Sequence, residues 1–147
     1  MYLFNQLTSG PAEVNVTLHL TYEQRQRSLL RVRTEDDIDV GIKLNRGELP
    51  EVGCLLQSAS GEIAQVQAAP ESVSVSCTDD MLLFSRACYH LGNRHVKLQI
   101  EPGRLCYLHD HVLDEMLVQL GLKVEHAMAA FCPESGAYAG GHAHHHH

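Results

Sequence analysis

The sequence lacks the basic charge typical of nucleic-acid-binding proteins and the long apolar runs typical of membrane proteins. Its formal net charge is −7 with histidine neutral, because 11 Lys and Arg stand against 18 Asp and Glu. Nucleic acid is therefore not an expected partner, since there is no basic excess to displace counterions from a phosphate backbone. No window approaches the ~20 apolar residues that a membrane span needs, so no membrane partner is expected either.

Signals for export and for disulfide bonding are also missing. The first residues, MYLFNQLTSG, contain no basic segment and only a short apolar run, unlike a secretory signal peptide. The five cysteines are an odd number and include no C-x-x-C pair, which argues against a disulfide framework and against a cysteine zinc site. We therefore expect free thiols and a cytoplasmic protein.

The common catalytic motifs are absent. The chain has no H-E-x-x-H, no G-x-S-x-G, no P-loop and no G-x-G-x-x-G. His109, Asp110 and His111 offer the ligand types of a catalytic metal site, but no general base is evident beside them. Cys88 and His90 lie two apart on a predicted helix and so do not face each other. We predict that the chain is not an enzyme, with a metal-dependent hydrolase as a distant alternative.

What is present is a strong β pattern in the first half. The segments EVNVTLHL, SLLRVRT, DIDVGIKL and SASGEIAQVQA alternate apolar and polar residues, as half-buried strands do. Glycine and proline fall between them, at expected turns. No helical period is long enough to indicate a helix. Residues 1–70 are therefore predicted to form a β-rich domain of about six strands.

The pattern changes after Pro70. Strands are predicted at 72–76, 95–100, 105–109 and 122–131, with helices at 78–92 and 110–121. The order β-α-β-β-α-β is that of a ferredoxin-like domain, here residues 71–134. Residues 135–147 are rich in Gly, Ala and His, and are expected to form a mobile tail because they cannot bury a core. The predicted fold class is α+β.

Helix boundaries follow from capping residues. Thr78 or Asp79 is the expected N-cap of the first helix and Gly92 its C′ residue, while Asp110 caps the second helix and Gly121 ends it. One face of the second helix is predicted to be apolar, formed by Val112, Leu113, Met116, Leu117 and Leu120.

The sequence contains eleven histidines, which are candidate metal ligands. His109 and His111 form an H-x-H pair, and residues two apart in an extended segment point to one face, so both imidazoles can reach one ion. They can equally be ordinary polar residues at an exposed helix start. His90 lies in the last helical turn, where a histidine is common for structural reasons. His95 alone cannot hold an ion tightly, but a symmetric dimer would bring two copies together.

The sequence ends GGHAHHHH, which supplies His142, His144, His145, His146 and His147. Such a tract chelates Ni, Cu and Zn with little geometric demand. It can be a native tail or an added tag. Tags are usually longer and follow a linker, which favours a native tail.

Three segments resemble a known family. YHLGNRHV (89–96), LHDHVLDEMLVQLGL (108–122) and FCPESGAY (131–138) are similar to the urease accessory protein E family, the nickel metallochaperones of urease. LTYEQRQRSLLRV and GIKLNRGELP extend the resemblance over essentially the whole chain, although Asn45 stands where a proline is common.

The resemblance implies a homodimer formed through the C-terminal domain, with a peptide-binding-like domain before it. It implies that His95 of each protomer binds nickel at the interface, that His109 and His111 are auxiliary ligands, and that the tail adds capacity. His109 is the weaker of these assignments because that position varies in the family. The implied partners are the urease accessory GTPase and the urease apoprotein complex.

We therefore predict a carrier of Ni(II) for urease assembly, able also to bind Cu(II) or Zn(II). Two alternatives stay open: a general metal buffer, and a peptide-binding co-chaperone whose histidines are incidental.

Overall fold

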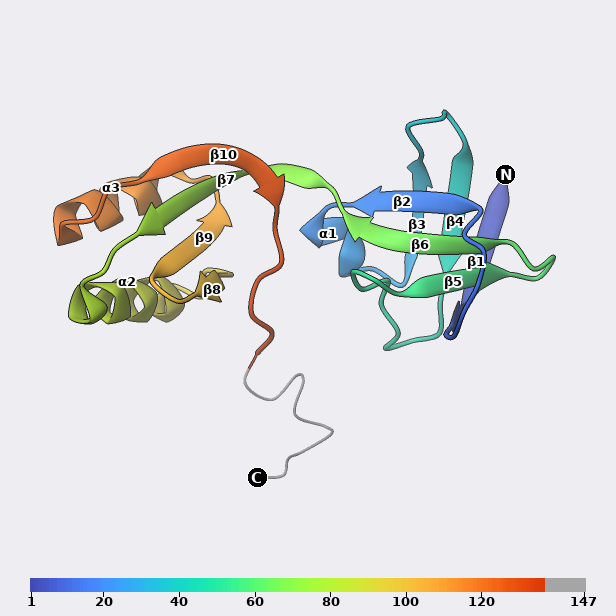
Figure 1. Cartoon of the computed structure of the whole chain (residues 1–147), viewed down its shortest axis with the longest axis horizontal. Coiled ribbons are helices and arrows are strands. Elements are labelled where there is room, and N and C mark those ends of the chain that lie inside the picture. Colours follow the sequence, from blue (N-terminus) through green and yellow to red (C-terminus); the bar gives the residue numbers. More distant parts are fainter. Residues whose placement is uncertain (137–147) are drawn as a thin grey trace, which may run out of the picture. The chain divides into compact units, whose positions relative to one another are not determined.

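The computed structural model describes residues 1–136, and the chain divides into two compact units, Met1–Ala69 and Pro70–His147 (Figure 1). The predicted tail, residues 135–147, lies outside the described residues except for its first two positions. No helix in the described part of the chain has the length and apolar character that a membrane crossing requires.

The N-terminal unit is a six-stranded curled sheet with the order β2-β6-β5-β1-β4-β3 (Figure 1). Its strands are β1 (Tyr2–Thr8), β2 (Val16–Leu20), β3 (Leu29–Arg33), β4 (Asp39–Lys43), β5 (Leu55–Ser58) and β6 (Ile63–Ala68). The pairs β1–β4 and β2–β6 are parallel, and the other neighbours are antiparallel. The prediction of about six strands is confirmed.

Alternation along these strands builds the core of the N-terminal unit. In β2, for example, Val16, Leu18 and Leu20 are buried while Thr17 and His19 are exposed. The buried side chains are mainly aliphatic, and the fully buried ones are Phe4, Leu20, Val40, Ile42, Leu56, Ala64 and Val66.

One short helix was not predicted in this unit. The helix α1 (Tyr22–Arg25) has only four residues, too few for a helical period to show. It is stabilised by a capping box: the Thr21 hydroxyl accepts from the Gln24 N–H, and the Gln24 side chain accepts from the Thr21 N–H. The spacing of Thr21 and Gln24 is the sequence signal that indicates it.

The C-terminal unit has a four-stranded sheet with the order β10-β7-β9-β8 and antiparallel neighbours throughout (Figure 1). In chain order its elements are β7 (Pro70–Cys77), α2 (Met81–Asn93), β8 (Gln99–Glu101), β9 (Arg104–Leu108), α3 (His111–Leu120) and β10 (Glu125–Ala130). The predicted ferredoxin-like β-α-β-β-α-β pattern is confirmed.

Both helices pack on the same apolar cluster with β9. The cluster joins Phe84, Ala87 and Leu91 of α2, Leu113 and Leu117 of α3, and Leu105 and Tyr107 of β9. The predicted apolar face of α3 is correct except at Val112, whose side chain is 46% exposed. Val112 lies in the first turn of α3, next to the exposed His111, and does not belong to the apolar cluster.

Two capping predictions for α3 are confirmed and two for α2 are wrong. Asp110 accepts hydrogen bonds from the N–H groups of Val112 and Leu113, and Gly121 adopts a left-handed conformation at the end. In α2, however, Asp80 is the N-cap and accepts from the Leu83 N–H. The helix also continues through Gly92 to Asn93.

The C-terminal end of α2 overturns the prediction that His95 begins a strand. Val96 N–H donates to Leu91 O and His95 N–H donates to Gly92 O, which is the Schellman arrangement. His95 is the C′ residue, with φ 60. Residues 95–98 are therefore not in a strand, and β8 begins only at Gln99.

Candidate metal centre

A row of polar side chains crosses three strands of the C-terminal sheet. The register of β7 places Ser74 opposite Tyr107 of β9 on one side and opposite His126 of β10 on the other. Residues opposite each other on paired strands point to the same face. Tyr107 belongs to the cluster under the helices, so this row lies on the helix-covered face.

Asp114, in the first turn of α3, connects the row to the helix. Its Oδ1 accepts a hydrogen bond from the Tyr107 hydroxyl at 2.6 Å. Its Oδ2 lies 2.8 Å from Nε2 of His126. One carboxylate therefore joins α3, β9 and β10.

His109 completes the cluster from the segment between β9 and α3. Its backbone N–H donates to Ser72 O at 3.1 Å, which extends the pairing with β7 beyond the end of β9. Its Nδ1 lies 3.3 Å from Asp114 Oδ2 and 3.2 Å from Ser74 Oγ. The His109 and His126 rings meet edge to face with centroids 4.3 Å apart.

The surroundings keep Asp114 ionised and Tyr107 protonated. Partial burial acts to raise the pKa of Asp114, but hydrogen bonds with Tyr107, Ser74 and His126 outweigh it and lower the pKa below its usual range. Burial, reinforced by the hydrogen bond to Asp114, raises the pKa of Tyr107. The cluster therefore presents an anionic oxygen beside two imidazoles, with a fixed hydroxyl donor behind it.

Two imidazoles and a carboxylate are suitable ligands for divalent ions of the nickel, copper and zinc group. One ligand atom from each of His109, Asp114 and His126 lies within 4.8 Å of the others. Among residues 1–136, this is the one place where three or more metal-ligating side chains come together in this way.

The histidines singled out in the sequence lie in different places. His109 is part of the cluster, while His111 is the exposed first residue of α3. His95 is exposed at the C-terminal end of α2. His142, His144, His145, His146 and His147 lie outside the described residues.

Two members of the cluster, Asp114 and His126, were not predicted from the sequence. Neither forms a short-range motif with His109, because His126 is 17 residues further along the chain. The predicted ferredoxin-like strand order is the one feature of the sequence that could have indicated that these residues lie near His109. In the sheet of a ferredoxin-like domain the third and fourth strands lie on either side of the first, so the register of β7 at Ser74 brings His126 of β10 toward the end of β9.

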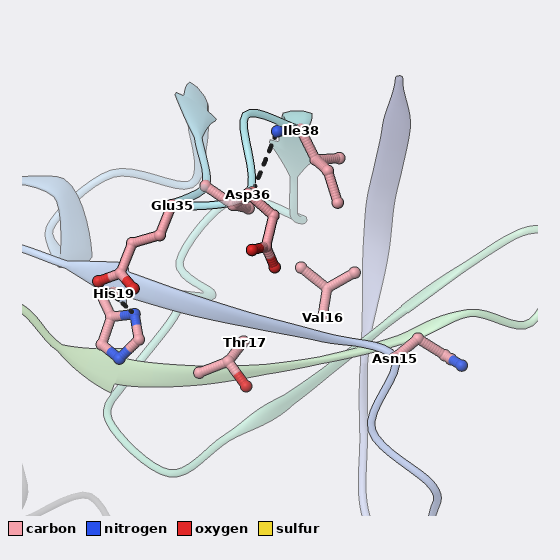
Figure 2. Close-up of a pocket in the computed structure, with 8 residues that line it drawn as sticks. Asn15, Val16, Thr17, His19, Glu35, Asp36 and Ile38 are labelled. Atoms are coloured by element: carbon pink, nitrogen blue, oxygen red, sulfur yellow. Dashed lines mark hydrogen bonds and ion pairs between the residues drawn. The ribbon is translucent and has the colours of Figure 1, made fainter.

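The N-terminal unit has a small polar pocket of about 220 Å³ (Figure 2). It lies between β2, which contributes Thr17 and His19, and the loop before β4, which contributes Glu35 and Asp36. His19 Nδ1 is 4.0 Å from Glu35 Oε1, and Figure 2 shows the two side chains facing each other. With one imidazole, this pocket offers a weaker ligand set than the C-terminal cluster.

A β-sheet unit followed by a ferredoxin-like unit with a His-Asp-His cluster defines a two-domain protein whose second domain has metal-binding side-chain chemistry. Comparison with known proteins supplies the family. Residues 5–69 match the model of the UreE urease accessory protein, N-terminal domain, and residues 71–147 match that of its C-terminal domain. The chain belongs to the UreE urease accessory protein family, as the sequence resemblance indicated.

Individual relatives are similar over at least four fifths of this chain. A urease accessory protein UreE of Vibrio parahaemolyticus is 51% identical over 159 residues, covering 100% of both chains. That of Alkalilimnicola ehrlichii is 52% identical over 129 residues, covering 88% of this chain and 79% of the relative. That of Pseudomonas putida strain W619 is 54% identical over 124 residues, covering 83% and 76%.

Proposed function

We propose that this protein is a nickel metallochaperone, which carries Ni(II) as cargo and donates it to the urease apoprotein during assembly of the urease metal centre. Family membership supports a role in urease maturation. The nickel proposal is carried by one observation: His95, in the sequence GNRH, is exposed and held in a left-handed backbone conformation.

That conformation is informative because it is unfavourable. A non-glycine residue in the left-handed region costs on the order of 1–3 kcal/mol, and such positions cluster at functional sites. Glycine is the usual residue at the C′ position of a Schellman motif. The histidine at this position therefore lowers the stability of the fold, which supports a role for its imidazole.

A single imidazole binds a divalent ion weakly, so the proposal requires two copies of His95. The helix that precedes His95 supports this. On α2, the exposed side chains Met81, Leu82 and Tyr89 lie on one face, since they fall within about 100° of helical rotation. An exposed apolar helix face is typical of a protein interface. We propose that the homodimer forms through the C-terminal unit and brings the two His95 rings to one ion.

The remaining histidines have an auxiliary part in the proposal. His109 and His111 would hold further ions, and His142 and His144 to His147 would add capacity. Imidazole also accepts Cu(II) and Zn(II), so selectivity for nickel would come from geometry and supply. Only neutral imidazole binds metal, and acid should therefore release the cargo.

The proposed partners are the urease accessory GTPase and the urease apoprotein complex, in the cytoplasm. A docked partner could supply replacement ligands at a shared interfacial site, so that delivery is a ligand exchange and needs no chemical step. The protein would accordingly act without being an enzyme.

Nickel transfer tests this proposal. Nickel-loaded wild type should activate apo-urease in the presence of the accessory GTPase complex, and His95→Ala should lose most of that activation. His90→Ala is the matched control, because His90 is an exposed histidine in the last turn of α2, five residues before His95. Equal activation by His95→Ala would contradict the proposal.

Two rival functions give different results in the same assay. A general metal buffer would bind nickel but would not raise urease activity above that of a simple chelator. A peptide-binding co-chaperone would support activation with His95→Ala and would fail when its N-terminal sheet is disrupted.

A further inference from the structure

We propose that His109, Asp114 and His126 form a second metal site within one protomer, for a divalent ion of the nickel, copper and zinc group. Its ligands are separate from His95 and need no second copy of the chain. The site also assigns to His109 partners other than His111, its neighbour in the H-x-H pair.

The spacing of the ligand atoms supports this site. Ligands bound at about 2.0–2.2 Å from one ion lie roughly 3 to 3.5 Å from their neighbours. Asp114 Oδ2 lies 2.8 Å from His126 Nε2 and 3.3 Å from His109 Nδ1. Small rotations of the two exposed rings would place an ion between all three atoms.

The site is also supported from behind. The Tyr107 hydroxyl binds Asp114 Oδ1 and leaves Oδ2 directed at the histidines. Such outer hydrogen bonds fix the orientation of metal ligands. The ligands come from α3, β10 and the segment after β9, so the fold of the unit holds them in place before an ion arrives.

An ion can reach the cluster from solvent. The side chains of His109 and His126 are 39% and 56% exposed, whereas that of Asp114 is 14% exposed. The half-buried carboxylate provides charge in a partly dehydrated position, and the exposed rings leave further coordination positions open. Open positions suit an ion that must be handed on to other ligands.

Without metal, the same atoms form a hydrogen-bond network, so the alternative is a purely structural role that anchors α3 to the sheet. The two roles differ in stoichiometry. A metal site adds one ion per protomer and requires His126, whereas a structural network adds none. A third arrangement, with the ion held by the H-x-H pair, would require His111 and not His126.

The inference relies on the proposed function only for the choice of metals, and its test is therefore done without the interfacial site. The full-length His95→Ala protein is titrated with Zn(II) and, separately, Ni(II), and bound ions are counted by native mass spectrometry and calorimetry. His126→Phe in this background should bind one ion fewer per protomer, and Asp114→Asn should weaken the same site at least tenfold. His90→Ala should keep the full count.

Folding is controlled by circular dichroism and thermal unfolding, and His126→Phe should fold because position 126 is exposed on an edge strand. An unchanged ion count in a folded His126→Phe protein would overturn the inference. Loss of the ion in His111→Ala, with retention in His126→Phe, would assign it to the H-x-H pair and overturn it equally. Neither result depends on whether His95 binds nickel.

Discussion

The two units use buried polar groups in different ways. In the N-terminal unit these groups close local structure: Arg25 donates to Leu20 O at 2.7 Å, five residues away, and Ser58 bonds Glu62 across the turn between β5 and β6. In the C-terminal unit, Ser74 contacts His109, which is 35 residues away. A polar group that stabilises a turn needs only a partner nearby in the sequence. A cluster of metal-ligand side chains forms only when the whole domain is folded.

Histidine follows the same division. The first 69 residues contain only His19, and the remaining ten histidines lie in residues 70–147. The β-rich unit thus has an aliphatic core and little metal-binding chemistry, while the ferredoxin-like unit combines a core with imidazoles at its edges. We therefore expect the proposed metal binding to depend on the folding of the C-terminal unit and not on that of the N-terminal one.

The largest expected effect comes from two single core substitutions, one in each unit. Leu117 of α3 and Leu56 of β5 are both fully buried, so Leu117→Ala and Leu56→Ala should each destabilise their unit by about 2–5 kcal/mol. Only Leu117→Ala should weaken Zn(II) binding, because α3 carries Asp114. Urea unfolding followed by hydrogen exchange in each unit, with calorimetry, measures both effects. Comparable loss of Zn(II) binding in Leu56→Ala would break the distinction between the units.

A second comparison uses two glycines with positive φ. A Cβ at Gly103, in the turn before β9, would lie 2.9 Å from Thr78 O, whereas one at Gly47 would meet nothing within 4 Å. Both alanine variants pay backbone strain of about 1 kcal/mol, but Gly103→Ala must also move the backbone. We expect a total near 2 kcal/mol or more for Gly103→Ala in thermal unfolding. Equal losses of stability in Gly103→Ala and Gly47→Ala would show that the close contact between the new Cβ and Thr78 O does not destabilise the fold.

A third prediction is that one substitution at His95 raises stability and removes function. His95→Gly should stabilise the C-terminal unit by about 1 kcal/mol, since glycine adopts the left-handed conformation without strain. The same variant should lose the proposed nickel site at the dimer interface. His95→Ala is the matched control because it removes the imidazole and keeps the strain. If the glycine variant were no more stable than the alanine variant in thermal unfolding, His95 would not be strained.

The smallest expected effect is a pH dependence in the N-terminal unit. The hydrogen bond with Ser58 lowers the pKa of Glu62, despite a small opposing effect of burial. A carboxyl with a lowered folded pKa stabilises the fold above its unfolded pKa and loses that contribution as pH falls through the folded value. The stability difference between wild type and Ser58→Ala should therefore shrink between about pH 6 and about pH 3. The free energies of unfolding are measured by urea titration. A difference between the two proteins that stayed constant over this pH range would show that the Glu62 carboxylate does not contribute to it.

Sequence patterns predicted the elements whose burial is periodic. β2 alternates strictly, and α3 has its core residues at helical spacing between a capping Asp110 and a terminal Gly121. β1 has no such pattern, because Phe4 is its one buried residue, although it is central in the sheet. Its place is determined by pairing with β4 and β5, which a single sequence does not encode locally.

The site was predictable only in part, for the same reason. His109 and His111 form a visible short motif, and the strain at His95 depends on how α2 ends. Asp114 and His126 join His109 only through the register of β10 and β9 against β7. The register of the strands therefore determines which histidines come together. Local spacing in the sequence identifies only those that form a short motif, His109 and His111.

Nickel titration of wild type and His95→Ala, read by native mass spectrometry for oligomer and ion count, decides whether His95 binds the tightest ion. Wild type should be a dimer whose first, tightest Ni(II) binds once per dimer. His95→Ala should remain a dimer and lose that ion while keeping weaker ones. A His95→Ala dimer that still bound one tight Ni(II) per dimer would contradict the account.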